Sequence, residues 1–141
     1  MAAEPQSYAN HKRIDPWFHQ VGFGLLLLAL ILAVHQLFQG RGAGQLVIVL
    51  LLAVVLWLAR GYALRVQDRL IRLEETLRMH RLLDPQQCLR IPELTRAQFV
   101  ALRFASDPEL AERMTEALQE HLSGDAIKRR IQVWRPDTFR V

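Results

Sequence analysis

The fold is decided by two apolar stretches, VGFGLLLLALILAVHQLF at residues 21–38 and LVIVLLLAVVLWLARGYAL at residues 46–64. The first has two polar side chains near its far end, and as a helix it would extend about 27 Å, close to the thickness of a bilayer core. The second is uninterrupted by a polar side chain until Arg60. The two stretches predict membrane-spanning helices at about residues 17–38 and 45–64.

The ends of both spans carry residues that membrane helices use there. Asp15 can cap the first helix, and Pro16 suits its first turn, where a missing N–H costs nothing. Arg60 can extend its side chain to the lipid headgroups. Residues 39–45 form a seven-residue, glycine-rich connection, so short that the two helices must be antiparallel neighbours. The pattern predicts a transmembrane hairpin over residues 16–64.

Basic residues near the spans predict the orientation of the hairpin. Lys12 and Arg13 precede the first span, and Arg41 alone lies in the connection. Four arginines end or follow the second span: Arg60, Arg65, Arg69 and Arg72. Cytoplasmic loops carry the excess of Lys and Arg, so both termini are expected in the cytoplasm, with residues 1–15 as a tail. A cleaved signal peptide is the alternative, although the apolar run exceeds its usual core and no Ala-x-Ala site follows.

A long helix is expected to leave the membrane, because only Gly61 interrupts good helix formers between residues 46 and 83. Over residues 65–83 the apolar side chains become periodic, as in a juxtamembrane amphipathic helix. Four of them, spaced by 4, 3 and 4, form what we term the apolar stripe: Val66, Leu70, Leu73 and Leu77. This spacing continues that of Ala59 and Ala63 and is typical of a coiled-coil or helix-packing seam.

Two interpretations of this amphipathic helix stay open. In the first, the four arginines bind anionic lipid headgroups, while the apolar stripe engages a second copy or the C-terminal domain. In the second, the charges form a solvated face with pairs such as Asp68–Arg72 and Glu74–Arg78, and the stripe is ordinary core. If the stripe is buried, replacing Leu73 by Ala should cost about 2–5 kcal/mol.

Residues 84–141 are expected to form a small cytoplasmic domain of three helices. Asp84-Pro85 should end the long helix. Capping signals predict helices that begin after Thr95, Ser106 and Ser123 and run to about Ala105, Leu122 and Pro136. Acidic residues dominate the second of these helices and basic residues the third, so their faces can neutralise each other. The predicted fold class is all-α: a transmembrane hairpin, a long cytoplasmic helix and a three-helix domain.

Three segments carry a resemblance to a known family: VQDRLIRLEE at residues 66–75, ALRFASD at 101–107 and WRPD at 134–137. They are similar to an uncharacterised family of short bacterial two-span membrane proteins, a family of unknown function. The resemblance covers essentially the whole chain. It implies a location in the bacterial cytoplasmic (inner) membrane and the hairpin-plus-helices layout. It implies no activity, cofactor or catalytic residue.

The sequence contains no catalytic or metal-binding pattern that we recognise. The single cysteine, Cys88, excludes an internal disulfide and a zinc site built from cysteines. His19 and His35 lie at opposite ends of one span, so haem ligation would need two copies. Neither span carries an acidic or Lys side chain of the kind that a transporter needs at depth. We therefore expect no enzyme activity, no cofactor and no small-molecule substrate.

The pattern as a whole favours a small membrane-anchored interaction protein, a scaffold or an accessory subunit of a membrane complex. Its expected partners are membrane lipid and either another protein or a second copy. A membrane-tethered nucleic-acid-binding regulator is the alternative, because residues 95–122 can be drawn as a helix-turn-helix and residues 127–134 as a basic helix. The second helix of that pair is acidic, however, so no nucleic acid is expected. A haem-binding or enzymatic membrane subunit is a further alternative.

Overall fold

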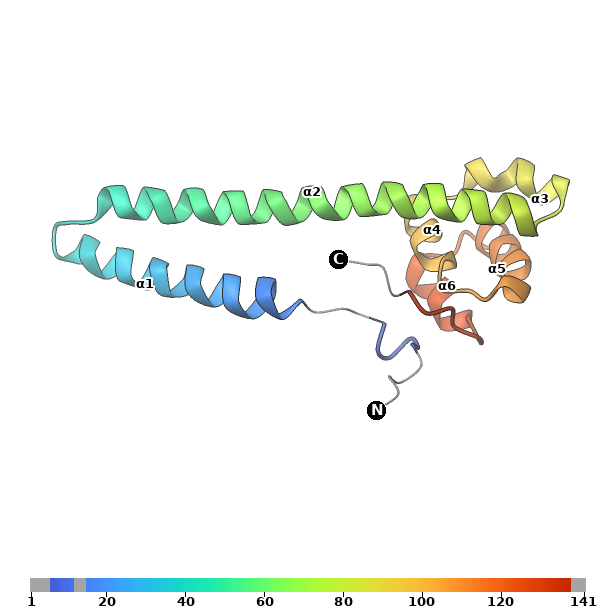
Figure 1. The fold of residues 1–141 in the computed structure, drawn as a ribbon, viewed down its shortest axis with the longest axis horizontal. Coiled ribbons are helices and arrows are strands. Elements are labelled where there is room, and N and C mark those ends of the chain that lie inside the picture. The colour runs from blue at the N-terminus through green and yellow to red at the C-terminus, as the bar shows by residue number, and fades with distance from the viewer. Residues whose placement is uncertain (1–5, 12–14, 138–141) are drawn as a thin grey trace. The chain divides into compact units, whose positions relative to one another are not determined.

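The structure, a computed structural model, describes residues 6–11 and 15–137, which are helical apart from loops and one isolated bridge between Ala105 and Trp134 (Figure 1). In chain order its helices are η1 (Trp17–Gly22), α1 (Phe23–Phe38), α2 (Ala43–Leu82), α3 (Pro85–Arg90), η2 (Ile91–Glu93), α4 (Arg96–Leu102), α5 (Asp107–Gln119) and α6 (Gly124–Arg130). They divide into a hairpin unit, Arg13–Leu64, and a C-terminal unit, Arg65–Arg140 together with Met1–Lys12. The predicted all-α class is confirmed.

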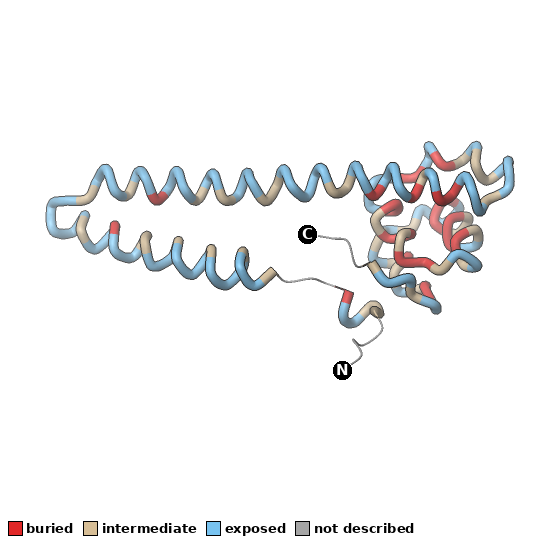
Figure 2. Tube along the Cα trace, in the orientation of Figure 1, coloured by how far each residue is buried: buried red, intermediate tan, exposed pale blue. Residues whose placement is uncertain are grey.

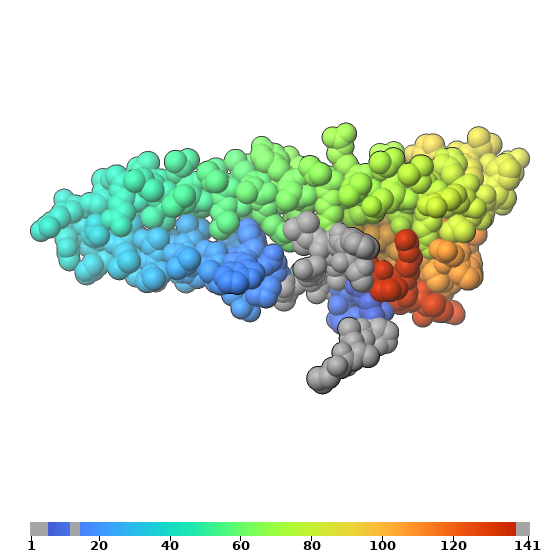
Figure 3. Space-filling view, viewed as in Figure 1, coloured from blue at the N-terminus to red at the C-terminus, as the bar shows by residue number. Residues whose placement is uncertain are grey.

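The hairpin unit consists of the π-helical turn η1, helix α1 and the first half of α2, which runs antiparallel to them. Asp15 caps this unit, because its Oδ1 accepts hydrogen bonds from the backbone N–H groups of Trp17 and Phe18 at 2.9 and 3.3 Å. The side chains of α1 and α2 meet along the hairpin (Figure 3). Ala33 and Val49 are buried there. Contact between the two helices of the hairpin thus includes Ala33, the one residue of α1 that is buried.

The connection between α1 and α2 is a tight glycine turn over residues 39–42. Helix α1 ends in a Schellman motif: the N–H of Arg41 donates to the carbonyl of Gln36, and that of Gly40 to Leu37. Gly40 and Gly42 have positive φ of 71° and 87°. A Cβ at Gly42 would also lie 2.8 Å from that of Gln36. The turn is shorter than the predicted seven residues because α2 begins at Ala43.

The C-terminal unit has a core built from the distal half of α2 and from α3 to α6. Its largest fully buried side chains are Met79, Phe99, Leu102, Phe104, Leu110, Met114 and Ile127. Helix α4 packs against both α5 and α6. The start of α6 approaches α4 so closely that a Cβ at Gly124 would lie 2.8 Å from the carbonyl oxygen of Ala97. This unit is the small helical domain that the sequence predicts, enlarged by part of α2.

The capping signals place the starts of the C-terminal helices correctly. Thr95 and Gln98 form the predicted reciprocal capping box at α4, and the buried amide of Gln98 also donates to the carbonyls of Ala117 and Leu122. Ser123 caps α6 through the N–H of Ala126. These short-range signals are reliable because a cap involves residues only three apart.

Three details differ from the predicted domain. Asp84 not only follows the long helix but also caps a further short helix, α3, by accepting from the N–H of Gln87 at 2.9 Å. Ser106 precedes α5 without making a side-chain cap. Helix α6 ends at Arg130 rather than near Pro136, because the following segment is extended and pairs with the loop before α5. In that pairing the N–H of Ser106 donates to the carbonyl of Val133 at 3.1 Å.

Candidate interaction surface

Along the distal half of α2, buried and exposed residues alternate (Figure 2), and the four residues of the apolar stripe are among the exposed ones. The exposed fractions of its four residues are 67% for Val66, 52% for Leu70, 57% for Leu73 and 55% for Leu77. The residues of α2 that are buried in the C-terminal unit are Ile71, Glu75, Arg78 and Met79. At 3.6 residues per turn, these two sets are centred about 150° apart around the helix axis. The stripe therefore faces away from the core.

This position corrects one part of the sequence interpretation. The alternative in which the C-terminal domain covers the apolar stripe is wrong, and so is the reading of the stripe as ordinary core. The expected cost of 2–5 kcal/mol for Leu73→Ala accordingly does not apply to the fold of a single chain, because Leu73 has no core contacts to lose. The alternative in which a second copy or another protein covers the stripe stays a prediction.

The buried side of α2 carries two charged residues, Glu75 and Arg78, and the second interpretation of the helix had placed Arg78 on a solvated face. Arg78 is 7% exposed, and its guanidinium donates to Glu75 at 2.9 Å, to Asp107 at 2.6 Å and to the carbonyl of Ala105 at 2.7 Å. These bonds join α2 to the start of α5. A buried guanidinium is tolerated because its donors find acceptors in this way.

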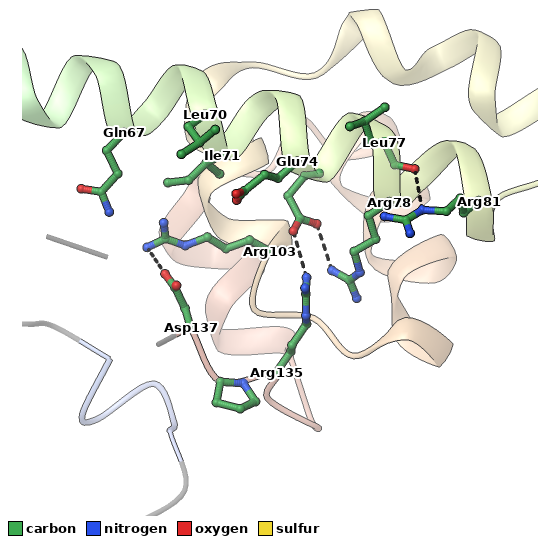
Figure 4. A pocket seen from close by; sticks show the side chains of 12 residues that line it. Gln67, Leu70, Ile71, Glu74, Leu77, Arg78, Arg81, Arg103, Arg135 and Asp137 are labelled. Atoms are coloured by element: carbon green, nitrogen blue, oxygen red, sulfur yellow. Dashed lines mark hydrogen bonds and ion pairs between the residues drawn. The ribbon is translucent and has the colours of Figure 1, made fainter. Parts of the chain in front are cut away.

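A groove of about 700 Å³ runs along α2 beside these charges (Figure 4). Two ion pairs line it: Glu75 accepts from Arg135 at 3.0 Å, and Arg103 pairs with Asp137 at 3.2 Å. Leu70 and Leu77 of the apolar stripe form part of the rim. We refer to Glu75, Arg78, Asp107 and Arg135 as the charge cluster. Its effect is structural, because it fastens the extended segment after α6 to the long helix.

The two predicted ion pairs along α2 are replaced by pairs with other residues. Asp68 pairs with Arg96 of α4 at 3.3 Å instead of with Arg72. Arg78 pairs with Glu75 instead of with Glu74. The first difference arises because α4 presents a charged partner that α2 alone does not contain, and the second is a change of partner within α2.

The four arginines proposed to contact lipid are not gathered in one place. Arg60 stacks over Phe18 within the hairpin unit, with its Cζ 5.3 Å from the ring centroid. Arg72 stacks over Phe99 of the C-terminal unit at 5.5 Å. Arg65 and Arg69 are exposed. Lipid contact by these residues stays a prediction, and Lys12 and Arg13, on the other flank, lie outside the described residues.

Residues 6–11 belong to the C-terminal unit, which the sequence interpretation as a tail did not anticipate. The hydroxyl of Tyr8 donates to Asp125 at 2.7 Å. The ring of His11 is buried beside Phe104 and Trp134, at centroid distances of 5.9 and 5.7 Å. The hydrogen bond from Tyr8 is the largest cause that lowers the pKa of Asp125, and the hydrogen bond from Arg129 is the next. The same bond to Asp125 raises the pKa of Tyr8. No local signal marks this contact, because its partners are more than 90 residues apart.

Opposite charges of α5 and α6 meet at Arg130, whereas the other two arginines of these helices pair within their own helix. Arg130 of α6 contacts Glu120 at 2.7 Å and Glu116 at 3.4 Å, and the first contact lowers the pKa of Glu120. Arg129 pairs within its helix with Asp125. The basic helix of the nucleic-acid-binding alternative was expected over residues 127–134, but α6 ends at Arg130. Its two arginines, Arg129 and Arg130, form ion pairs with acidic side chains.

The residues considered as cofactor ligands are dispersed. His19 contacts the carbonyl of Asp15 at 2.9 Å, His35 contacts Gln39 at 3.0 Å, and Cys88 is a half-buried thiol near the carbonyl of Leu83. Within residues 6–11 and 15–137, no three His, Cys, Asp or Glu side chains are grouped so that they could hold a metal ion.

The fold and this surface define a small all-α protein in which an apolar helical hairpin continues, through one long helix, into a helical domain. Two of its helices, Trp17–Phe38 and Ala43–Leu82, are long and apolar enough to cross a membrane. The chain belongs to the family of unknown function DUF6526, whose family model matches residues 1–141. No curated protein and no solved structure matches the chain. The resemblance to an uncharacterised family is thereby confirmed over its whole length.

Proposed function

We propose that this protein is a non-enzymatic interaction protein anchored in the bacterial cytoplasmic membrane, acting as a scaffold or as an accessory subunit of a membrane complex. The observation that carries the proposal is the exposed apolar stripe. Seven large apolar side chains are exposed among the described residues of the C-terminal unit, and four of them form this single row on α2. Scattered apolar residues need no explanation, whereas a contiguous row marks a binding surface.

Anchoring in a membrane is supported by the surface of the hairpin. Most of its described leucine, isoleucine and valine side chains are exposed, including Leu27, Ile31 and Val54 at more than half of their area. Water would oppose this exposure, whereas a bilayer would not. Because both helices satisfy their backbone hydrogen bonds internally, they can also enter hydrocarbon without unpaired polar groups.

The cytoplasmic position of both termini is supported by two observations. Tyr8 and His11 precede the hairpin, yet they contact residues that follow it, which supports a topology with both flanks on one side of the membrane. Arg65 and Arg69 follow the second helix, whereas Arg41 alone lies in the connection, and an excess of basic residues marks the cytoplasmic side.

Cysteine labelling of intact cells tests this topology. In a Cys88→Ser background, an impermeant maleimide should label Gly44→Cys from outside and should miss Val141→Cys. Gly44 is the suitable reporter because a side chain there meets nothing within 4 Å, whereas Gly42 has a positive φ and no room. Labelling of Val141→Cys from outside would invert the model of the topology.

Crosslinking in native membranes tests the interaction role. The wild-type protein and a Leu89→Asp control, altered at an exposed leucine of α3, should be crosslinked to the same species. A Leu73→Asp variant should lose that product, because the substitution places a charge in the middle of the apolar stripe without disturbing the core. If all three variants run as uncrosslinked monomers at low and at high expression, the interaction role is refuted.

The non-enzymatic part of the proposal has a separate test. Protein purified in detergent should contain no stoichiometric metal, haem or nucleotide by absorbance and elemental analysis. A stoichiometric cofactor would contradict the proposal, and His19, His35 and Cys88 would then be the first ligands to replace.

A further inference from the structure

The apolar stripe is flanked by two charged residues of opposite sign. In heptad notation Leu70 and Leu77 occupy a positions, and Val66 and Leu73 occupy d positions. Arg69 then falls at a g position on one side of the stripe, and Glu74 falls at the next e position on the other side. Both side chains are exposed, and neither forms an ion pair with another described residue. They are five residues apart on one helix, too far around its axis to pair with each other.

This spacing is the one that joins two parallel helices. In a parallel two-stranded coiled coil, a g residue of one helix faces the e residue five positions later on the other helix. Two copies of α2 would therefore form two symmetric pairs between Arg69 of one copy and Glu74 of the other. In an antiparallel arrangement g faces g and e faces e, which would bring like charges together.

We propose that the apolar stripe binds the apolar stripe of a second copy of this chain, in a parallel coiled coil that Arg69 and Glu74 hold in register. The inference names the partner for the interaction surface proposed above and rests on that function. A second copy is favoured over an unrelated protein because the stripe is self-complementary: one helix carries both members of the ion pair, as a two-fold symmetric interface requires.

Membrane anchoring makes so short a seam sufficient. The stripe spans less than two heptads, which is too little for a stable coiled coil in dilute solution. Copies inserted in one bilayer with the same topology already present α2 in parallel, and their confinement raises the effective concentration of one helix near another. Ala59 and Ala63 continue the seam with small side chains, which let two helices approach closely.

Exchange of the two charges tests the proposal. Full-length protein with Gly44→Cys in a Cys88→Ser background is labelled with a donor or an acceptor dye and reconstituted in phospholipid vesicles. Energy transfer between the two dyes measures association as the ratio of lipid to protein is raised. Arg69→Glu and Glu74→Arg should each weaken association about tenfold, because both symmetric pairs change from attraction to repulsion. The double variant, Arg69→Glu with Glu74→Arg, should restore wild-type association.

Mixing the single variants provides a matched control. A copy with Arg69→Glu and a copy with Glu74→Arg complement each other, so their mixture should associate as well as the wild type although each alone does not. A folding defect could not be rescued in this way. Association that is unchanged in both single variants, or that stays weak in the double variant, would overturn the inference.

Disulfide crosslinking separates this inference from the broader function. In the Cys88→Ser background, mild oxidation should crosslink Leu73→Cys into dimers in native membranes and should leave Leu89→Cys monomeric. If Leu73→Asp removes a crosslink to a different protein while Leu73→Cys forms no dimer, the interaction role stands and the second copy is refuted. If Leu73→Asp changes no crosslink and Leu73→Cys forms no dimer, both are refuted.

Discussion

On the distal half of α2, the side that carries charged residues is buried and the apolar side is exposed, the reverse of what is usual for a helix packed on a soluble domain. The side buried in the chain contains Glu75 and Arg78, two charged residues, beside Ile71 and Met79. The opposite side contains the apolar stripe and is exposed (Figure 2). Hydrophobic periodicity therefore identifies an apolar surface on a helix, but it does not tell whether the same chain buries that surface.

The buried side can contain charges only because they are paired. Glu75 has a side chain that is 5% exposed, and it contacts Arg78 and Arg135 with its two different oxygens. Removing a charged group from water costs several kcal/mol, which attraction and hydrogen bonds must offset. The two sides of α2 should therefore respond differently to substitution: the buried side depends on its polar partners within the unit, whereas the apolar stripe has no cover within the unit.

The largest effect is expected from Arg78→Leu. This change leaves the buried Glu75 without its nearest partner and should lower the free energy of unfolding of the C-terminal unit by about 3–5 kcal/mol. Hydrogen exchange of α4 and α5 amides in the full-length protein measures this loss. Arg81→Leu is the control on the same helix, since Arg81 is exposed, and it should change the free energy by less than about 0.5 kcal/mol. Equal effects would show that the charge cluster does not hold the unit together.

Met79→Ala and Leu73→Ala compare the two sides directly. Met79 is fully buried, so its truncation should destabilise the C-terminal unit by about 2–5 kcal/mol. Leu73 is 57% exposed, and its truncation should change the same hydrogen-exchange free energy by no more than about 0.5 kcal/mol under conditions where the protein is monomeric. A large loss for Leu73 in the monomer would mean that the stripe is covered within one chain.

A smaller effect is expected on lipid binding at the arginines near the hairpin. Arg65→Ala should weaken the retention of anionic phospholipid by about 1 kcal/mol, measured by native mass spectrometry of the purified protein. Arg81→Ala should have less effect, because Arg81 is 16 residues, or about 24 Å of helix, farther from the span and beyond the screening length. Identical retention in both variants would remove the reason to assign Arg65 to headgroups.

The smallest effect concerns the exposed contact between Tyr8 and Asp125. Because the pKa of Asp125 is lower in the folded state than in the unfolded chain, this contact stabilises the fold above the ordinary aspartate pKa. That contribution is lost as the pH falls through the lowered pKa. NMR signals of the Tyr8 ring should report weaker docking in acid. Asp125→Asn should dock weakly already at neutral pH, and an identical acid response in that variant would assign the transition to another group.

Features that depend on neighbouring residues could be predicted from the sequence. The long apolar runs indicated the hairpin helices, and Thr95 and Ser123 marked two helix starts to within a residue. Asp84 before Pro85 carries the same type of signal and could have indicated α3, but it was interpreted only as the end of the preceding helix.

Features that depend on distant partners could not be predicted. The buried side of α2 looked solvated because Glu75 and Arg78 are charged, and their partners Arg135 and Asp107 lie about 60 and 29 residues away. The helix after Ser123 ends at Arg130, earlier than the sequence predicts, for a related reason. The loop before α5 competes for the backbone of residues 133–135, and local propensity contains no information about that competition.

The contact between Tyr8 and Asp125 also sets an order of events during synthesis. The two residues are 117 positions apart, so at about 5–20 residues per second roughly 6 to 23 s separate their appearance. Closing so long a loop costs little more than closing one of half the length, because the entropy depends on the logarithm of the length. Tyr8 is made early but can bind Asp125 only after the helices between them have been synthesised.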